Sequence, residues 1–456
     1  MNNLFELSDL SLTQFATSFA QGAVWLEEGM EKQIATFDLV VREMSDKRNY
    51  LVYGGLEELA NYIKNLKYSK KQIKLLLNGK IITKKFAKYL ENFRFSGDIY
   101  AMPEGTIFFP GEPIVRVTAP LIEASLIEIA LFNITVSNVL FLSKAARIRS
   151  VSQGKGIILG MQRGHSFESG MKGLRSGYIC GLLTTGWPNF IQKYNLPQKR
   201  EYLINGQHFF IKSFQKEIEA FRKLAKYFPN NAGFMIDTYD VDRGLSNAIV
   251  IANELKRKGN GLRLVTIDSG DLAALSKKVR SKLDENNLKE VKILAATNMN
   301  ENKIKKLFDG GAPIDFFILA TEYVTVSDAP SLELVYKISE LRDGKTIRYT
   351  AKLTEGKTSY PGRKQVFRKF KNGSMSRDVV GLVNESYGTP LLKKIINKGI
   401  LTQKLPNLDS IRKFFDKQFE SLPKKLLDIE NKQKYPVIVS QKIKNLFAKI
   451  KKEHNK

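Results

Sequence analysis

Leu264-Val-Thr-Ile-Asp-Ser-Gly-Asp-Leu272 is the stretch that decides the fold, because a short apolar run passes through a polar turn into a helical pattern. A run of mainly apolar residues is typical of a strand that is buried on both faces. The helical pattern then continues from residue 271 to residue 285. The stretch therefore predicts one βα unit, with Asp268 at the carboxyl end of its strand.

Similar apolar runs lie on either side of this unit, starting at residues 156, 234, 293 and 316. The later runs recur at roughly the 25–30 residue spacing of βα units. Helical patterns fill the gaps at 246–258 and 301–308. Strands that alternate with helices run parallel, so the sequence predicts a barrel or a doubly wound sheet from about residue 156 onward.

Polar residues follow several of these runs. In a βα-barrel the functional groups gather at the carboxyl ends of the strands. We therefore expect a site that includes Asp237, Asp268, Asn298 and Thr321.

The rest of the chain has a different pattern. Residues 1–150 mix amphipathic helices at 56–94 with strand signals such as 35–42. Later strand-like pieces lead into an expected loop at 360–366, and residues 401–456 are helical and rich in lysine. At roughly 100–200 residues per domain, the 456 residues suggest two or three domains.

The composition is that of an ordinary globular protein, with 43% hydrophobic and 26% charged residues, which excludes a disordered, collagen-like or disulfide-scaffold chain. The net charge is +27. Such a surplus can mark a nucleic-acid binder, but here it is mostly lysine, scattered along the chain, and no nucleic-acid motif is present. We interpret it as solvated surface charge that helps to hold phosphorylated small molecules, and expect no specific nucleic-acid partner.

The sequence points to a cytoplasmic protein. Its single cysteine, Cys180, can form no internal disulfide and excludes cysteine-rich zinc sites. The first residues lack the basic and apolar regions of an export signal. The most apolar stretch, 121–142, contains Glu123 and Glu128, so we interpret it as a buried helix pair rather than a membrane span.

The turn at 268–271 has two interpretations. Gly270 lets the backbone approach a ligand, the following helix offers free N–H groups to an anion, and Asp268 and Asp271 suit a metal or ribose hydroxyls. Alternatively, Ser269 or Asp271 simply caps the helix.

A second pair of acids, Asp237 and Asp240, also follows a strand. The two side chains either face one cleft or cap the next helix.

Histidine chemistry has few possible positions, since the chain has three histidines. His208, beside Gly206, suits a nucleophile or general base, or else a core residue among aromatics. His165, in Gly164-His165-Ser166, is expected in an exposed loop.

Taken together, the motifs resemble those of the nicotinate phosphoribosyltransferase family. The matches keep the family's order and spacing almost from end to end, and their combination is specific although each alone is weak. They are Ala35-Thr-Phe-Asp38, Phe93-Arg-Phe-Ser-Gly-Asp-Ile-Tyr-Ala-Met-Pro-Glu-Gly105, Lys144-Ala-Ala-Arg-Ile148, Ser213-Phe214, Glu219-Ala-Phe221, Asp237-Thr-Tyr-Asp240, Ile267-Asp-Ser-Gly-Asp-Leu272, Pro361-Gly-Arg-Lys-Gln-Val366 and Lys434-Tyr-Pro-Val437.

The resemblance implies an α/β fold: an irregular βα-barrel of the type II phosphoribosyltransferase kind with a smaller α/β sandwich domain. It implies an N-terminal sandwich domain at 1–150, the phosphoribosyl-binding barrel at 151–335, strands that complete the sandwich at 336–400, and a helical C-terminal extension at 401–456. It also implies a homodimer whose sites lie at the subunit interface.

The resemblance further implies an enzyme of NAD salvage that forms nicotinate mononucleotide from nicotinate and phosphoribosyl pyrophosphate, with Mg²⁺ and with ATP as co-substrate. In the family, a histidine of a G-T-x-A-H motif is transiently phosphorylated, and His208 matches it. Asp268 is the second expected catalytic residue. The expected substrate-binding residues are Phe15, Arg163, Asp237, Ser269, Gly270, Asp271 and Thr321, and no metal-ligand set is predicted.

Of these assignments, that of Phe15 has an alternative. Phe15 falls on the family's stacking tyrosine, where a phenyl ring still stacks but lacks the hydroxyl, and it also suits the core face of a helix. Arg163 is the choice for the nicotinate carboxylate.

The binding loops depart from the family pattern while the framework motifs survive. Ile204-Asn205 replaces a G-T, Gly160-Met161-Gln162-Arg163-Gly164 keeps one arginine of a pair, and Thr266 replaces an arginine. Further departures are Thr184-Thr185-Gly186-Trp187, Thr297-Asn298-Met299 and Ile318-Leu319-Ala320-Thr321.

A lost charged hydrogen bond costs about 1.5–3 kcal/mol, so these departures leave three hypotheses. They are a working nicotinate phosphoribosyltransferase, a catalytically degenerate member that acts as a binding or scaffold protein, and a variant that uses a different pyridine base such as nicotinamide.

Overall fold

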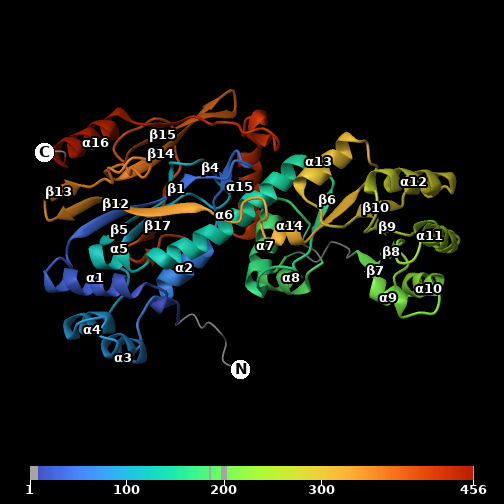
Figure 1. Cartoon of the computed structure of the whole chain (residues 1–456), viewed down its shortest axis with the longest axis horizontal. Helices are drawn as coiled ribbons and strands as arrows, with labels where there is room; N and C mark the ends of the chain where they lie inside the picture. The colour runs from blue at the N-terminus through green and yellow to red at the C-terminus, as the bar shows by residue number, and fades with distance from the viewer. Residues whose placement is uncertain (1–8, 184–185, 197–202, 455–456) are drawn as a thin grey trace. The chain divides into compact units, whose positions relative to one another are not determined.

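We analysed a computed structural model, which describes residues 9–183, 186–196 and 203–454. The chain forms two compact units (Figure 1). The inserted unit comprises Lys144–Pro330, and the discontinuous unit comprises Met1–Ser143 together with Ser331–Lys456.

The inserted unit contains a parallel sheet of six strands in the order β6-β11-β10-β9-β8-β7. Five of the six strands correspond to the predicted apolar runs, whereas β7, with the sequence Ile-Asn-Gly, was not predicted. The strands are β6 Gly156–Leu159, β7 Ile204–Gly206, β8 Ala232–Met235, β9 Leu264–Ile267, β10 Lys292–Ala295 and β11 Phe316–Leu319.

Helices alternate with these strands and cover one face of the sheet. α10 packs against β7 and β8, and α12 packs against β9 and β10. The helices of this unit, besides the end of α6, are α7 Phe167–Ile179, α8 Pro188–Tyr194, α9 His208–Lys212, α10 Glu217–Tyr227, α11 Val241–Lys256, α12 Leu272–Glu285, α13 Glu301–Asp309 and α14 Thr321–Val324.

The other face of the sheet carries every second residue of the strands. Leu264, Leu294 and Ala296 form a small cluster there. A Cβ atom on Gly233 would lie 2.6 Å from the Leu264 side chain and 3.3 Å from Asn205 Oδ1, which places Asn205 on the same face. The predicted α/β fold with parallel strands is confirmed.

The discontinuous unit is built on a seven-stranded antiparallel sheet in the order β13-β12-β1-β5-β3-β17-β18. Its strand β1, which pairs with β12 and β5, confirms the strand predicted at 35–42. The strands are β1 Ile34–Glu43, β3 Asp98–Ala101, β5 Pro113–Pro120, β12 Glu333–Asp343, β13 Thr346–Tyr349, β17 Lys393–Asn397 and β18 Ile400–Leu401.

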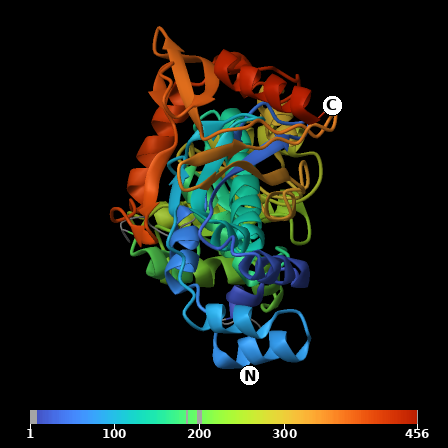
Figure 2. The same cartoon turned by 90° about the vertical axis from the view of Figure 1, so that its left-hand side faces the viewer.

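Amphipathic helices bury the apolar side of this sheet, as predicted for 56–94. Within this unit α1 and α3–α4 lie on one side of the sheet, and α16 lies on the other (Figures 1 and 2). The helices are η1 Asp9–Leu12, α1 Ala16–Glu27, α2 Leu56–Asn65, α3 Lys70–Asn78 and α4 Lys84–Glu91, and a two-stranded sheet pairs β2 Leu51–Val52 with β4 Ile107–Phe108.

The C-terminal region contains more strand than the sequence predicts. The expected loop at 360–366 already includes the start of a strand, and a short strand within 401–456 joins the same sheet as a parallel neighbour of β15. This four-stranded sheet has the order β16-β14-β15-β19. Its elements and the flanking helices are β14 Lys364–Lys371, β15 Ser374–Leu382, β16 Thr389–Pro390, α15 Leu408–Glu420, η2 Lys424–Leu427, β19 Val437–Val439 and α16 Gln441–His454.

The predicted apolar helix pair is present as α5 Leu121–Ser125 and α6 Glu128–Val151. Among the described residues, Leu121–Val151 is long and apolar enough to cross a membrane, and 56% of its most apolar window is buried inside the protein. Such burial favours the predicted core helix pair.

Candidate active site

The carboxyl ends of β8 and β9 bring two predicted residues together. Asp237 follows β8, and its Oδ2 accepts hydrogen bonds from the Asp268 backbone N–H at 2.9 Å and from Ser269 Oγ at 2.7 Å. Because both strands are parallel neighbours, their ends meet at one edge of the sheet. Asp237 therefore holds the turn that carries Asp268 and Ser269.

His208 faces the same turn from the first residue of α9, directly after β7. Its Nε2 lies 3.6 Å from Asp268 Oδ2, and its Nδ1 lies 3.0 Å from Thr238 Oγ1. The imidazole is thus held on both nitrogens, and about a third of its side chain stays exposed. The structure places His208 at the sheet edge rather than in the core.

Burial raises the pKa of the Asp268 carboxyl above its ordinary value, and the negative charge of Asp237 adds to this effect. His208 and the backbone N–H of Thr297 act in the opposite direction. The site thus contains a partly exposed carboxyl group whose pKa is raised, and an imidazole whose Nε2 lies 3.6 Å from that carboxyl.

Asp271 and Asp240 both cap helices. Asp271 Oδ1 accepts from the backbone N–H groups of Ala273 and Ala274 at the start of α12, and Asp240 Oδ1 accepts from Arg243 N at the start of α11. The capping interpretation therefore holds for both acids. Gly270 lies between Asp268 and Asp271 with φ +79°, a conformation that favours glycine.

The turn after β10 is strained. Thr297 and Asn298 both adopt left-handed conformations, with φ +67° and +40°, which side chains with a Cβ rarely adopt. The Thr297 N–H reaches the Asp268 carboxyl, and Lys303 Nζ donates to the Asn298 carbonyl at 3.0 Å. The third strand end thereby contributes a backbone donor to the site.

The turn after β11 carries a separate pair. Arg163 Nη1 donates to Thr321 Oγ1 at 3.2 Å, so the arginine that remains of the family's pair lies beside the predicted phosphate-loop threonine. Arg163 is exposed and Thr321 is partly buried.

Three buried polar atoms near these strand ends have no hydrogen-bond partner among the residues that the structure describes: Asn205 Oδ1, Asp237 Oδ1 and Thr266 Oγ1. Thr266 is fully buried and lies on the same sheet face as Leu264, two residues before Asp268. Asn205 and Thr266 stand where the family pattern has other residues, so the departures leave unsatisfied groups on the inner face.

Phe15 belongs to the discontinuous unit, where it directly precedes α1. Because 67% of it is exposed, the alternative of a core phenylalanine is wrong. Thr184 and Thr185 lie outside the described residues. Among the residues that the structure describes, no group of three or more histidine, cysteine or acidic side chains is arranged to hold a metal ion.

One neighbour of His208 was missed by sequence reasoning. Thr238 contacts the imidazole, yet a threonine within Asp237-Thr-Tyr-Asp240 carries no pattern that distinguishes it from a turn residue. Its position directly after Asp237 at a strand end was the available signal.

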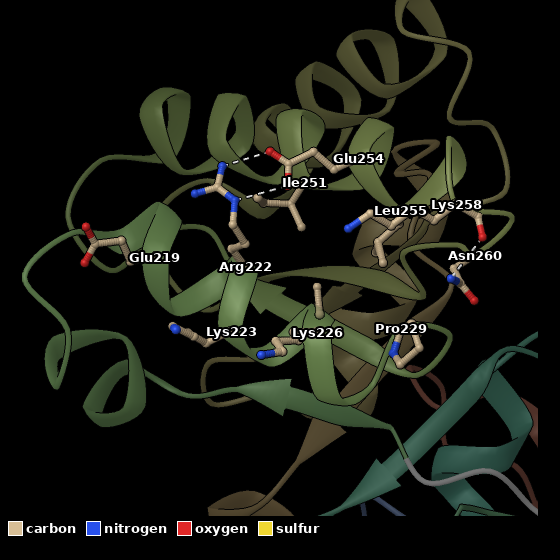
Figure 3. A pocket seen from close by; sticks show the side chains of 11 residues that line it. Glu219, Arg222, Lys223, Lys226, Pro229, Ile251, Glu254, Leu255, Lys258 and Asn260 are labelled. Atoms are coloured by element: carbon tan, nitrogen blue, oxygen red, sulfur yellow. Dashed lines mark hydrogen bonds and ion pairs between the residues drawn. The ribbon is translucent and has the colours of Figure 1, made fainter.

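A hollow of about 430 Å³ lies elsewhere, between α10 and α11, and contains none of the predicted residues (Figure 3). Arg222 is held there by Glu254 through two hydrogen bonds of 3.1 and 2.8 Å. Basic side chains line much of the hollow, among them Arg222, Lys223 and Lys226 of α10. No residue of the candidate site lines it, so the hollow is not part of that site.

Family models match both parts of the discontinuous unit. The nicotinate phosphoribosyltransferase N-terminal domain matches residues 18–136, and the C-terminal domain of the same family matches residues 381–447.

Curated relatives match over nearly the whole chain. The nicotinate phosphoribosyltransferase pncB2 of Mycobacterium tuberculosis is 34% identical, over 91% of this chain and 89% of the relative. The nicotinate phosphoribosyltransferase of Bacillus subtilis is 31% identical, over 96% of this chain and 94% of the relative.

A solved structure has the same fold. The crystal structure of human nicotinic acid phosphoribosyltransferase superposes with a TM-score of 0.81 at 20% identity and covers 96% of this chain and 99% of that one. With two relatives above 30% identity over most of its length, the chain belongs to the nicotinate phosphoribosyltransferase family.

Proposed function

We propose that this protein is a nicotinate phosphoribosyltransferase, which forms nicotinate mononucleotide from nicotinate and phosphoribosyl pyrophosphate in NAD salvage and is driven by ATP hydrolysis. Family membership supports the reaction class. The observation that carries the proposal for this chain is the placement of His208 Nε2 at 3.6 Å from Asp268 Oδ2, with Nδ1 held by Thr238.

His208 is the proposed phosphoryl acceptor. Its Nε2 attacks the γ-phosphorus of ATP, the bond to the ADP oxygen breaks, and water later hydrolyses the phosphohistidine. The contact between Thr238 and Nδ1 orients the ring and leaves Nε2 as the reacting nitrogen. Asp268, whose Oδ2 lies 3.6 Å from Nε2, takes the proton that this nitrogen must lose before it attacks.

In the transfer step, the nicotinate ring nitrogen attacks C1 of the ribose and pyrophosphate leaves. We propose that Asp268 and Ser269 bind the ribose hydroxyls, that Gly270 and Asp271 shape the turn around them, and that Thr321 with Arg163 contacts the charged groups of the substrates. Positioning and electrostatics supply most of the rate in such a reaction.

Mg²⁺ fits this site through its oxygen donors. Mg²⁺ prefers one or two carboxylates together with substrate phosphates, and Asp237 offers a buried carboxylate oxygen that has no partner. When bound, the ion neutralises charge on the leaving pyrophosphate. Asp237 and Asp268 are the residues that would hold it.

The quaternary state and location are proposals from the family resemblance and from composition. We propose a homodimer, with the exposed Phe15 as a stacking residue for the pyridine ring. We propose a cytoplasmic location, consistent with a single, buried cysteine, Cys180, which can form no internal disulfide.

The decisive experiment measures nicotinate mononucleotide formation by the purified protein, with and without ATP. His208→Ala is expected to abolish both the stimulation by ATP and acid-labile labelling of the protein by γ-labelled ATP. His165→Ala is the matched control, because this histidine lies in an exposed loop outside the site, and it is expected to keep full activity.

A parallel assay with nicotinamide tests the variant with a changed base, which the unpartnered Thr266 hydroxyl motivates. Product from nicotinamide alone would overturn the assignment of nicotinate. No product from either base, with any divalent metal or pH, would leave a binding or scaffold protein.

A further inference from the structure

Lys144, part of a motif that the proposed function does not use, lies in a buried charge cluster of the inserted unit. Its Nζ lies 2.7 Å from Glu301 Oε2 and 3.0 Å from Asp328 Oδ1. The second oxygen of Glu301 accepts from Arg147 Nε at 2.8 Å. The side chains of Lys144 and Glu301 are each 1% exposed, and those of Arg147 and Asp328 are less than one-tenth exposed.

The two acids lie on the segments that follow two neighbouring strands, β10 and β11. Glu301 is the first residue of α13, three residues after the positive-φ residue Asn298. Asp328 lies four residues beyond the end of α14, the helix that begins with Thr321. A single ammonium group therefore joins the segment after β10 to the segment after β11.

Stability alone is a poor account of this arrangement. Burying charges costs several kcal/mol per ion, and an apolar replacement of similar volume is often as stable. A buried cation between two acids has, however, a demanding geometry, since both carboxylates must meet one nitrogen. Such a cluster favours one arrangement of the segments that carry it.

Thr297 connects the buried charge cluster to the candidate site. Its backbone N–H contacts the Asp268 carboxyl, and its left-handed conformation persists only where the surroundings hold it. Glu301, four residues later, is the nearest fully buried charged anchor along the chain.

We propose that Lys144 is a positioning residue for phosphoribosyl transfer, which fixes the turns at Thr297 and Thr321 relative to one another through Glu301 and Asp328. This inference rests on the proposed function. His208 begins α9 and Thr238 follows β8, so neither stands on the two segments that Lys144 joins, and we expect histidine phosphorylation to change far less than phosphoribosyl transfer.

The test uses Lys144→Met, which keeps the length of the side chain and removes its charge. We expect the KM for phosphoribosyl pyrophosphate to rise at least tenfold, because a displacement of about 1 Å costs on the order of 10²-fold in rate. Labelling of His208 by γ-labelled ATP is expected to stay within twofold of the wild type. Lys144→Arg, which keeps the charge, is expected to restore part of the KM.

The control is Lys364→Met in the discontinuous unit. Lys364 is also buried and lies 2.7 Å from Asp38, so the substitution breaks an ion pair of equal burial. We expect a similar loss of thermal stability with an unchanged KM. Equal KM values for the two variants, or a parallel loss of histidine labelling in Lys144→Met, would assign Lys144 a structural role only.

A second measurement is independent of activity. Asp328→Asn weakens the ion pair between Lys144 and Asp328 and leaves the pair between Lys144 and Glu301. In this variant, backbone hydrogen exchange should become faster at residues 321–328 and stay unchanged at residues 296–301. In Lys144→Met it should speed up at both. Unchanged exchange in both variants overturns the inference, whereas an inactive wild type overturns the proposed function alone.

Discussion

At the scale of single residues, the carboxyl of Asp268 sets the expected pH dependence. Burial and the negative charge of Asp237 raise the pKa of this carboxyl. Because the ionised carboxylate is the proposed active form, kcat/KM should begin to fall, as the pH is lowered, at a pH above the ordinary pKa range of an aspartate. Asp237→Asn removes the negative charge that helps to raise this pKa, and it keeps a side-chain oxygen that accepts hydrogen bonds. We expect the acid limb to move to lower pH, which a pH profile of kcat/KM measures.

Glu254→Gln serves as the control for this measurement, since it removes a partly buried acid that pairs with Arg222 outside the site. Its acid limb should coincide with that of the wild type. An acid limb that stays in place in Asp237→Asn would mean that a group other than Asp268 controls it.

Thr266 offers a test of stability. Its hydroxyl is fully buried and has no hydrogen-bond partner, which costs on the order of 1–3 kcal/mol relative to a satisfied group. Thr266→Val has nearly the same shape and no polar atom. We expect the free energy of unfolding to rise by about 1 kcal/mol, measured by denaturant titration.

Thr106→Val is the comparison for this substitution, because Thr106 is buried and its hydroxyl donates a hydrogen bond to the Pro103 carbonyl at 2.6 Å. It should be neutral or destabilising. A loss of stability in Thr266→Val would show that the hydroxyl has a partner in solution.

The single residues of the site were predictable only in part. Asp237, Asp268 and Ser269 follow from their place at strand ends, and the structure brings them together with His208. The contact of Thr238 with the imidazole depends on how two strands meet in space, which no local pattern contains. The roles of all these residues stay predictions.

At the scale of elements, the turn between β9 and α12 depends on Gly270. Its φ of +79° disfavours other residues, and an added Cβ would lie 2.9 Å from Leu275 Cδ1. We expect Gly270→Ala to lower the free energy of unfolding by about 1–2 kcal/mol. The KM for phosphoribosyl pyrophosphate should rise, and enzyme kinetics with denaturant titration measure both effects.

Gly261→Ala provides the matched control, because Gly261 lies in the same unit with no atom near its Cβ position and no positive φ. It should change neither quantity. If the two variants behaved alike, the turn would tolerate a side chain and its conformation would not matter for binding.

The elements themselves follow well from the sequence. Alternation of apolar runs and helices predicted the parallel sheet, and a 3.6-residue pattern predicted the helices at 56–94. The C-terminal region was predicted as helical, yet Val437–Val439 adds a strand to a distant sheet. Three residues carry too short a pattern, and only pairing with β15 makes them a strand.

At the scale of the whole molecule, the net charge of +27 has a measurable effect. Phosphoribosyl pyrophosphate carries several negative charges and nicotinate carries one, so the surplus attracts the former more strongly. Raising the salt from about 0.1 M to 1 M shortens the screening length from about 10 Å to 3 Å. We expect the KM for phosphoribosyl pyrophosphate to rise severalfold and that for nicotinate to change less.

The same titration with two different salts at equal ionic strength separates screening from binding of a particular ion. Both salts should give the same curve. Equal sensitivity of the two substrates would mean that the surface charge does not act on binding.

The division of the whole chain was harder to predict than its elements. The sequence pattern predicts domain boundaries near residues 150, 335 and 400. In the structure the chain passes from one compact unit to the other after Ser143 and again after Pro330. Domains at 1–150, 151–335, 336–400 and 401–456 stay a prediction. Pairing between β1 and β12 joins distant segments, and such contacts leave no local trace in the sequence.

This pairing has a consequence for synthesis on the ribosome. β1 emerges early, but its neighbour β12 begins at Glu333, after the entire inserted unit. At about 5–20 residues per second, the nascent β1 waits on the order of 15–60 s with one edge unpaired. The inserted unit, which is continuous, has that interval to fold first, so a pause or truncation before Glu333 should expose the early strand to chaperones or to aggregation.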